Sequence, residues 1–374
     1  MKIVSIAGAR PNFVKVAPLV KEIGRHRDLT SVLVHTGQHY DHTMSQTFFD
    51  DLEIPAPDFN LGVGSGSHAA QTADVMRRVE PVLESVRPDV VLVVGDVNST
   101  IAAALTAVKL GITVAHVEAG LRSFDRAMPE EINHVLTDAI SHLLFVTEAS
   151  AVDNLRREGV AAARVHLVGN VMIDALEQTR SRWERSPVFA HLGIEPPRPY
   201  AVLTLHRPSN VDDARTLSGL LQALADVARA LPIVFPVHPR VRTSLRECEG
   251  LYWAADHGGE ALPEKGIVCL EPLGYLDFVA LVSRARLVLT DSGGIQEETT
   301  ILGVPCLTLR ENTERPVTVS HGTNRIVGTD PARIVAESLL ALEQPPAPRE
   351  RPPLWDGRAA ERIVRVLRAE GRGR

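Results

Sequence analysis

Residues 287–302 read LVLTDSGGIQEETTIL, and this stretch indicates the fold class. The apolar run 287–290 is too short for a helix and predicts a buried strand. The turn 291–294 follows at once, and 295–302 continues as a helix. Glycines at a strand-to-helix turn let the backbone approach a ligand, and the helix start offers unpaired N–H groups to an anion. The stretch therefore predicts an anion site, or alternatively an ordinary turn capped by Ser or Asp.

The same strand-turn-helix unit recurs along the chain, with short apolar runs alternating with amphipathic stretches of helical length. This alternation predicts parallel sheets covered by helices on both faces, which is an α/β fold. The predicted strands are 3–7, 32–36, 90–94, 114–117, 143–147, 201–205, 233–237, 267–270, 287–290 and 306–309. The clearest further helices are 99–110, 129–140 and 359–369.

The length of the chain indicates two domains, because 374 residues exceed the size at which one hydrophobic core stops growing. We expect residues 1–174 to form an N-terminal Rossmann-like domain and 175–354 a C-terminal one. Residues 344–353 hold five prolines and read as a connector to a last helix within 355–374. Ligands of doubly wound sheets bind beyond the carboxyl ends of strands, so we expect a site in a cleft between the two domains.

Composition excludes several classes of protein. The net charge is −6 and the charges are scattered, whereas a nucleic-acid-binding protein needs a basic field. No apolar stretch approaches the roughly 18 residues of a membrane helix, and the N-terminal apolar run stops at Arg10, too early for a secretion signal. The cysteines Cys248, Cys269 and Cys306 form neither a disulfide framework nor a zinc motif. We expect a cytoplasmic protein that binds neither nucleic acid nor membrane.

Acidic residues end two apolar strands of the first half, at Asp96 and Glu118, and Glu130 and Glu131 open the next helix. Carboxylates that converge at the end of a sheet repel each other, which gives one acid and one base near neutral pH. Metal binding is the alternative, but we expect no His-x-x-x-His or Glu-x-x-His pair on a helix to support it. We therefore predict acid–base chemistry without a metal.

Histidines and cations also follow strands. His206 and His238 each end a strand of the second half, and histidines facing acids are candidates for proton transfer. Arg315 follows the strand after the 291–294 turn, where a planar guanidinium suits a diphosphate. Arg10 and Lys15 lie at the helix start after the first strand, either as further anion contacts or as solvated cations.

The ordered set of motifs resembles the non-hydrolysing UDP-N-acetylglucosamine 2-epimerases, which share the two-domain GT-B architecture. The resemblance runs from Arg10 to the last helix. It is carried by Gly8-Ala9-Arg10-Pro11, Thr36-Gly37-Gln38-His39, Gly95-Asp96, the run from His116 to Arg122, Pro129-Glu130-Glu131-Ile132-Asn133, Gly169-Asn170, His206-Arg207, Pro236-Val237-His238-Pro239, the run from Asp291 to Glu298, and Thr313-Glu314-Arg315-Pro316.

The resemblance implies inversion at C2 of UDP-N-acetylglucosamine through elimination of UDP and its re-addition, with no cofactor and no metal. It implies that the last helix packs back on the N-terminal domain and that the protein is a homodimer. The implied catalytic residues are Asp96, Glu118, Glu130 and His206, with base and acid unassigned. The implied UDP-sugar contacts are Arg10, Lys15, His238, Phe278, Ser292, Gly293, Gly294, Glu298 and Arg315. A GT-B glycosyltransferase, or an epimerase of a related UDP-sugar, is the alternative.

This sequence departs from the family pattern at His134, where the family has Arg after Pro-Glu-Glu-x-Asn. Bacterial members bind a second UDP-N-acetylglucosamine as an activator. The resemblance implies that Gln38, Gln71, Arg122 and His134 would face that activator here. The histidine therefore bears both on whether this regulation persists and on which sugar is bound.

Overall fold

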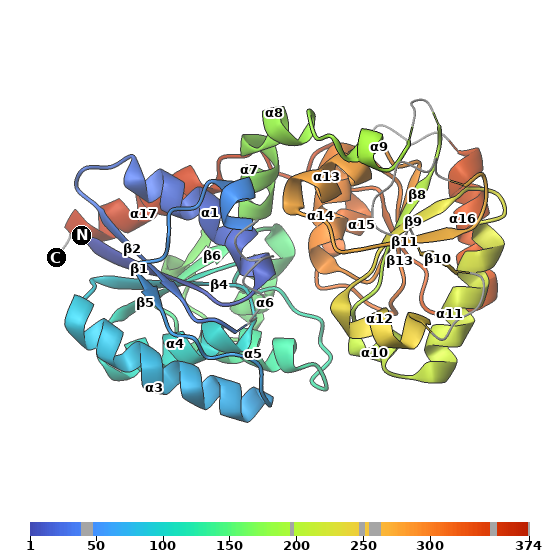
Figure 1. Ribbon diagram of the computed structural model, residues 1–374. Coiled ribbons are helices and arrows are strands. Elements are labelled where there is room, and N and C mark those ends of the chain that lie inside the picture. Colours follow the sequence, from blue (N-terminus) through green and yellow to red (C-terminus); the bar gives the residue numbers. More distant parts are fainter. Residues whose placement is uncertain (39–47, 195–197, 247–250, 254–262, 345–349, 373–374) are drawn as a thin grey trace. The chain divides into compact units, whose positions relative to one another are not determined.

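Two parallel sheets organise the chain in the computed structural model, which describes residues 1–38, 48–194, 198–246, 251–253, 263–344 and 350–372. His39 and Cys248, which the sequence analysis singled out, lie outside these ranges. The chain divides into two compact units, one of residues 1–178 with 353–374 and one of residues 179–352. Figure 1 shows each unit as a sheet between layers of helices.

The sheet of the first unit has seven parallel strands among the described residues, in the order β3-β2-β1-β4-β5-β6-β7. They are β1 (Lys2–Ala7), β2 (Thr30–His35), β3 (Phe59–Asn60), β4 (Val90–Val94), β5 (Thr113–Val117), β6 (Leu143–Val146) and β7 (Val165–Leu167). Every residue of β4 is buried, as expected of a central strand that is covered on both faces. The strand order reverses between β1 and β4, and such a switch point is where doubly wound sheets bind ligands.

Helices cover both faces of this sheet. They are α1 (Arg10–Gly24), α3 (His68–Val86), α4 (Asn98–Lys109), α5 (Pro129–Ile140), α6 (Ala149–Arg157), the short η1 (Ala162–Arg164), α7 (Val171–Gln178) and α17 (Ala359–Arg372). In Figure 1, α3, α4 and α5 lie on one face and α1 and α17 on the other. Val79 and Leu83 of α3 pack with alanines of α4 against the apolar side chains of β1, β4 and β5.

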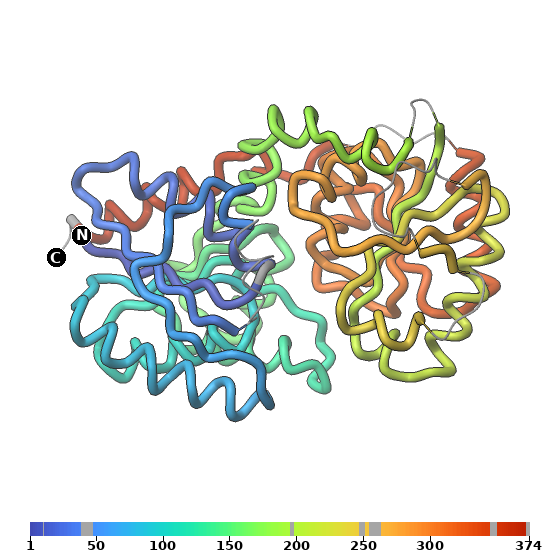
Figure 2. Tube along the Cα trace, viewed as in Figure 1, coloured from blue at the N-terminus to red at the C-terminus, as the bar shows by residue number. Residues whose placement is uncertain are grey.

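The C-terminal segment returns to the first unit, where α17 packs against α1 and α7 (Figure 2). The carboxylate of Asp174 accepts the N–H groups of Ala359 at 3.0 Å and Ala360 at 2.7 Å, which caps the start of α17. Just before the helix, the buried Trp355 indole donates to the Thr147 carbonyl at 3.0 Å. These contacts attach the last twenty residues to the sheet that begins the chain.

The second unit repeats the architecture, with seven parallel strands in its described part in the order β10-β11-β9-β8-β12-β13-β14. They are β8 (Ala201–Thr204), β9 (Ile233–Pro236), β10 (Leu251–Trp253), β11 (Ile267–Leu270), β12 (Leu287–Thr290), β13 (Cys306–Thr308) and β14 (Asn324–Ile326). Here the switch point lies between β8 and β12, at the stretch that opened the sequence analysis.

The helices of the second unit are α8 (Arg180–Trp183), α9 (Val188–His191), α10 (Pro208–Val211), α11 (Ala214–Val227), α12 (Pro239–Arg246), α13 (Tyr275–Ser283), α14 (Gly293–Leu302), α15 (Pro316–Ser320) and α16 (Pro331–Glu343). Helices α11, α12 and α16 contribute to one apolar cluster against the sheet, and α13 and α14 contribute to another. The sheet therefore has a separate core on each face.

The α/β prediction and all ten predicted strands are confirmed, with ends that shift by one or two residues. Four strands were missed: β3, β7, β10 and β14. Each holds two or three residues, lies at a sheet edge, and is partly exposed, so it lacks the continuous apolar run that marks a buried strand. None of the helices in the described part of the chain is long and apolar enough to cross a membrane.

Candidate active site

The switch point of the first unit is built by the turns after β1 and β4. Asn12, in the first turn of α1, accepts the N–H groups of Gly8 and Ala9 at 3.4 and 3.1 Å and donates to the Val94 carbonyl at 3.0 Å. Its amide therefore ties the two strand ends together. Gly8 is required for close approach, because a Cβ there would lie 2.4 Å from Ser99 Oγ.

Glu118 is buried at the end of β5 and has a left-handed backbone, with φ at 68°. Non-glycine residues rarely adopt this conformation, and it commonly marks functional sites. Lys15 of α1 donates to Glu118 Oε2 at 2.5 Å, with both side chains buried. Lys15, expected from the resemblance to hold the nucleotide, is therefore the ion-pair partner of a candidate acid here. Arg10 begins α1, and its side chain lies outside the described part of the structure.

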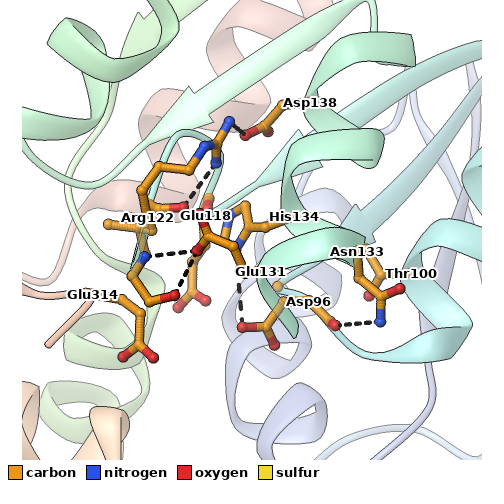
Figure 3. A network of polar contacts seen from close by, with 12 residues as sticks. Asp96, Thr100, Glu118, Arg122, Glu131, Asn133, His134, Asp138 and Glu314 are labelled. Carbon is orange, nitrogen blue, oxygen red and sulfur yellow. Dashed lines mark hydrogen bonds and ion pairs between the residues drawn. The ribbon is translucent and has the colours of Figure 1, made fainter. Parts of the chain in front are cut away.

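Asp96 follows β4, and its side chain is 30% exposed. Asn133 of α5 donates to the Asp96 carbonyl at 2.9 Å, and His134 Nδ1 lies 3.9 Å from Asp96 Oδ2. His134 Nε2 lies 2.6 Å from the Glu118 carbonyl oxygen. Figure 3 shows Asp96, Glu118 and His134 together in one polar network. One helix therefore contacts two of the predicted catalytic acids.

Behind these acids lies a buried ionic network. Asp138 of α5 accepts from His116 Nδ1 at 2.7 Å, the Gly120 N–H at 2.9 Å and Arg122 Nη2 at 2.8 Å. Burial alone would raise the pKa of Asp138, but the charge and hydrogen bond of His116, with the nearby Arg122, lower it to about 2. His116 Nε2 also meets the Gly95 carbonyl at 2.8 Å. Both ring nitrogens of His116 therefore contact oxygen atoms, which fixes the orientation of the ring.

The neighbouring acids that open α5 have different environments. Glu131 is buried, and its Oε2 accepts the N–H of Ser123 at 2.7 Å and the Ser123 hydroxyl at 2.8 Å. Glu130 is half-buried. Glu131 therefore holds the loop before the helix, and Glu130 stays the predicted catalytic residue of this pair.

One group among the described residues has the composition of a metal site, since ligand atoms of His116, His134 and Asp138 all lie within 4.8 Å of one another. The expectation that no Glu-x-x-His pair lies on a helix is wrong, since Glu131 and His134 form one on α5. The Glu131 carboxylate, however, already bonds to Ser123. Arg122 lies 2.8 Å from the Asp138 carboxylate, and this guanidinium already supplies the positive charge that a metal ion would bring. The contacts of this group are those of a hydrogen-bonded ionic network.

The residues expected from the resemblance to face an activator are buried in this unit. Gln38 Oε1 accepts from the N–H and the hydroxyl of Ser99 at 3.3 and 2.7 Å. Gln71 donates to the Gly64 carbonyl at 2.9 Å and accepts from Asn98 at 2.8 Å. Arg122 makes a bidentate pair with Glu158 at 2.7 and 2.8 Å. Each already holds neighbouring protein groups.

At the switch point of the second unit, Asp291 is fully buried at the end of β12. Its carboxylate accepts the N–H groups of His206 and Arg207 at 3.0 and 2.9 Å and the Asn210 amide at 3.2 Å. His206 Nδ1 lies 2.8 Å from Asp291 Oδ1. Burial alone would raise the pKa of Asp291, but the hydrogen bond and charge of His206 and these N–H donors lower it. Asp291 thus fixes the turn after β8 and orients the His206 ring.

The start of α14 has the features of an anion site. Ser292 is its N-cap residue without a side-chain cap bond, and Gly293 and Gly294 begin the helix. Arg315 lies against this turn, since a Cβ on Gly293 would be 3.7 Å from its guanidinium. Arg315 also pairs with the buried Glu297 at 2.6 Å. A cation and the positive end of a ten-residue helix therefore lie together.

Glu298, which follows Glu297 in α14, is buried. Burial raises the pKa of Glu298 to about 8; a hydrogen bond from Tyr275 opposes this, and the nearby charge of Glu297 adds to it. A carboxyl group that is protonated near neutral pH can both donate and accept hydrogen bonds. It is therefore suited to a ligand that carries hydroxyl groups.

The other predicted residues of this unit lie around the same strand ends. The His238 ring is 5.6 Å from that of His206, and His238 Nδ1 accepts the Arg240 N–H at 3.2 Å. Phe278 of α13 is half-buried against the core on that face. Arg310, which follows β13, forms a buried pair with Glu314 at 2.7 Å.

Comparison with known proteins agrees with this geometry. The model of the family described as UDP-N-acetylglucosamine 2-epimerase matches residues 21–368. The chain belongs to the UDP-N-acetylglucosamine 2-epimerase family.

Two relatives and one solved structure of this 2-epimerase family illustrate the likeness. A UDP-N-acetylglucosamine 2-epimerase homolog of Methanococcus maripaludis is 43% identical over 98% of this chain and 99% of its own. A UDP-2,3-diacetamido-2,3-dideoxy-D-glucuronate 2-epimerase of Pseudomonas aeruginosa is 40% identical over 91% and 92%. The crystal structure of the Methanocaldococcus jannaschii UDP-GlcNAc 2-epimerase with UDP-GlcNAc and UDP has a TM-score of 0.89 at 40% identity, over 99% of this chain and 100% of that one.

The sequence pattern did not reveal two of the histidine–aspartate pairs that the structure forms. The pairs of His116 with Asp138 and of His206 with Asp291 join residues 22 and 85 positions apart. The signal available for Asp291 was its place in the Asp-Ser-Gly-Gly turn directly after a buried strand. No comparable signal marked Asp138, which looks like any polar residue on an amphipathic helix.

Proposed function

We propose that this protein is a non-hydrolysing UDP-N-acetylglucosamine 2-epimerase that interconverts UDP-N-acetylglucosamine and UDP-N-acetylmannosamine. A base removes the C2 proton, the C1–O bond to UDP breaks, and the electron pair forms the C1–C2 double bond of 2-acetamidoglucal. UDP oxygen then adds back to C1, and an acid returns a proton to the opposite face of C2. Atoms balance without a cofactor, and the net change is inversion at C2.

The strongest support is the connection between Asp96 and Glu118, which His134 contacts from one helix. Removal of a weakly acidic C2 proton and its return from the other face need two positioned groups. In the proposal Asp96, Glu118 and Glu130 supply them, and the assignment of base and acid stays open.

In the proposal the second unit binds the UDP moiety. The start of α14 and Arg315 suit a diphosphate, because helix-end N–H groups and a planar guanidinium both bind phosphate oxygens. Glu298 suits the ribose hydroxyl groups, and His206, oriented by Asp291, suits the departing diphosphate. Stabilising the leaving UDP lowers the barrier of the elimination step.

A second candidate substrate comes from the relatives. One protein 40% identical to this chain is named for a 2,3-diacetamido uronate rather than for N-acetylglucosamine. Both sugars carry the C2 acetamido group and the UDP leaving group, so the same residues would serve either reaction. The two substrates differ at C3 and C6, and the comparison of both in one assay decides between them.

The test is isotope exchange at C2. The protein is incubated in deuterated water with UDP-N-acetylglucosamine, and separately with the diacetamido uronate, and followed by NMR. We expect deuterium at C2 and the manno epimer, with no free sugar released. Absence of both exchange and epimer from each substrate, at high enzyme concentration, would refute the proposed function. Free N-acetylmannosamine would indicate a hydrolysing enzyme instead.

We further propose that the enzyme is a cytoplasmic homodimer and that its product supplies envelope polysaccharide synthesis. Both points extend the family resemblance. Sedimentation at several protein concentrations tests the assembly, since a stable dimer keeps one sedimentation coefficient throughout. A monomer at working concentrations contradicts that part of the proposal.

A further inference from the structure

His134 has an environment that fixes which of its nitrogens carries hydrogen. The side chain is only 5% exposed, and Nε2 lies 2.6 Å from the backbone carbonyl of Glu118. A carbonyl oxygen can only accept a hydrogen bond, so Nε2 carries the hydrogen and donates it. In the neutral ring, Nδ1 is then left with a lone pair.

The ring is held neutral by its surroundings. Burial lowers the pKa of His134, and the nearby His116 and Arg122 lower it further, while Asp138 and Asp96 oppose the shift. These groups come from β5, the loop after it, α5 itself and the turn after β4. Glu118 at the end of β5 and Glu130 and Glu131 on α5 are further acids on these elements. The Nδ1 lone pair therefore faces Asp96 Oδ2 at 3.9 Å.

We propose that His134 is a positioning residue that serves two acids at once. Its Nε2–H holds the backbone of Glu118, and its Nδ1 accepts a hydrogen bond from Asp96 whenever Asp96 is protonated. This inference rests on the proposed 2-epimerase activity. It gives His134 a place in proton transfer, whereas the resemblance alone associates it with activator binding.

The contact to Glu118 matters because of the backbone conformation there. A left-handed φ of 68° is unfavourable for a residue with a Cβ and persists only where the surroundings hold it. The bond from His134 holds the carbonyl of this residue, while Lys15 holds its carboxylate at 2.5 Å. Together they fix the direction in which the Glu118 side chain leaves the strand.

The contact to Asp96 matters because it exists in one protonation state. An ionised Asp96 has no hydrogen to offer Nδ1, but a protonated one does. Catalytic hydrogen bonds are often long in unliganded enzymes, and a rotation of the partly exposed Asp96 carboxyl closes the 3.9 Å gap. When a C2 proton moves to Asp96, the resulting O–H donates to Nδ1; when Asp96 gives the proton up, that bond is released. His134 stays neutral in both directions.

Substitutions separate the two contacts. His134→Gln places an amide N–H near the former Nε2 and keeps the donor to Glu118, but removes the acceptor for Asp96. His134→Asn places a carbonyl oxygen near the former Nδ1 and keeps that acceptor, but cannot reach Glu118. His134→Arg introduces the family's residue, a permanent cation with no acceptor. Leu136→Gln, an exposed position on the same helix, is the control.

The first experiment needs no turnover. Protein with ¹⁵N-labelled histidine rings is examined by NMR at neutral pH, and the His134 signals are assigned among the 14 histidines by their loss in His134→Gln. We expect a neutral ring with hydrogen on Nε2 and a bare Nδ1. A ring with hydrogen on Nδ1, or on both nitrogens, would overturn the inference whatever the activity of the enzyme.

The second experiment follows the C2 exchange rate against pH in all variants. One limb of the pH–rate profile of C2 exchange should report the protonation of Asp96. His134→Gln removes the acceptor for protonated Asp96, and His134→Arg places a fixed cation beside it. Both variants should therefore move this limb to lower pH by about one unit, or roughly tenfold in proton affinity. His134→Asn should lower kcat but leave that limb in place. If the wild type exchanges C2 hydrogen and all three variants keep its pH–rate profile, the role proposed for His134 is wrong. The proposed 2-epimerase activity would then still stand. No wild-type exchange overturns the proposed function instead, and the ring tautomer still tests the contacts.

Discussion

The two switch points have the same topology and opposite chemistry. In the first unit, the strand ends carry Asp96 and Glu118, approached by imidazole and amine groups. In the second unit, they carry a glycine turn, a helix start and Arg315. One fold thus presents acids with basic partners at one switch point, and a helix start with an arginine at the other. The difference lies in the few residues that follow each strand.

The aspartates at the two sites make the difference concrete. Asp291 accepts hydrogen bonds from three N–H donors and lies 2.8 Å from His206 Nδ1, so its carboxylate is fully engaged in contacts that hold the turn. Asp96 lies 3.9 Å from His134 Nδ1 and is partly exposed. A carboxylate that is fully hydrogen-bonded orients its neighbours, whereas one that is loosely contacted can exchange a proton. The two aspartates therefore differ in how fully their hydrogen bonds are satisfied, and this difference supports the separate roles proposed for them.

The largest expected effect is that of Asp96→Asn. The amide cannot take or return the C2 proton, so we expect turnover to fall by about a thousandfold or more, in the range of general acid–base catalysis. UDP affinity should stay within roughly tenfold, or about 1.4 kcal/mol. Exchange kinetics and calorimetric titration with UDP measure the two quantities. Equal losses in both would show that Asp96 supports the structure and would remove the contrast with Asp291.

Asp291→Asn should have the next largest effect. An amide presents N–H groups to donors, so the turn after β8 and the His206 ring lose their anchor. We expect turnover to fall about a hundredfold and the free energy of unfolding to fall by about 1–3 kcal/mol. Because folding lowers the pKa of Asp291, its contribution is present above about pH 3.8 and lost as pH falls through the folded pKa.

Denaturation with urea and exchange assays check this change, with Asp213→Asn as a control. Asp213 caps α11 from an exposed position in the same unit, where its Oδ1 accepts the Thr216 N–H at 2.7 Å. Turnover in the control should match the wild type. An Asp291→Asn enzyme with wild-type turnover would contradict the orienting role.

The sequence predicted the fold because the fold depends on local signals, and the same signals underlie the predicted site. Apolar runs such as 90–94 define buried strands, and ligands bind where such strands end. The acids Asp96 and Glu118 were proposed as site residues because a charge directly follows a wholly apolar strand, and their roles stay predictions. The edge strands were missed since two or three half-exposed residues leave no pattern.

The partners of those acids could not be predicted from local signals. Lys15 reads as a helix-start cation in the sequence, but the parallel order of β1, β4 and β5 brings it to Glu118, 103 positions away. Glu130 and Glu131 are adjacent and chemically alike, and only the path of the loop through Ser123 separates them. Such pairings depend on three-dimensional register, which composition and periodicity do not determine.

A moderate effect is expected for the pH dependence of UDP binding through Glu298. The pKa of Glu298 is about 8 without ligand. If ribose hydroxyls donate to the ionised carboxylate, binding releases a proton below that pH. Affinity should then rise with pH from 6 to 8, by up to about tenfold per unit, and level off above 8. Calorimetry in buffers of different ionisation enthalpy measures both affinity and proton release.

Glu298→Gln is the matched variant for that titration, because it keeps the shape but does not ionise. Its residual pH dependence reports the ionisation of UDP itself. Identical profiles in the variant and the wild type would show that Glu298 does not receive the ribose. The anion site at the start of α14 would then act without it.

The smallest effect on function is expected at Asp174, a third buried aspartate that sharpens the contrast with Asp291. Both accept backbone N–H groups, those of Ala359 and Ala360 in the case of Asp174, whereas Asp291 also lies against His206. Burial raises the pKa of Asp174 to about 6, and the two N–H bonds oppose this shift. Because the folded pKa lies above the unfolded value of 3.8, stability should decline as pH rises from about 4 to 6, by on the order of 1–3 kcal/mol. Asp174→Asn should remove that decline and leave C2 exchange unchanged. Thermal unfolding of the wild type and of Asp174→Asn across this pH range measures the decline in stability. If the stability of both proteins depends on pH in the same way, the N–H groups at the start of α17 fully offset the burial of the Asp174 charge.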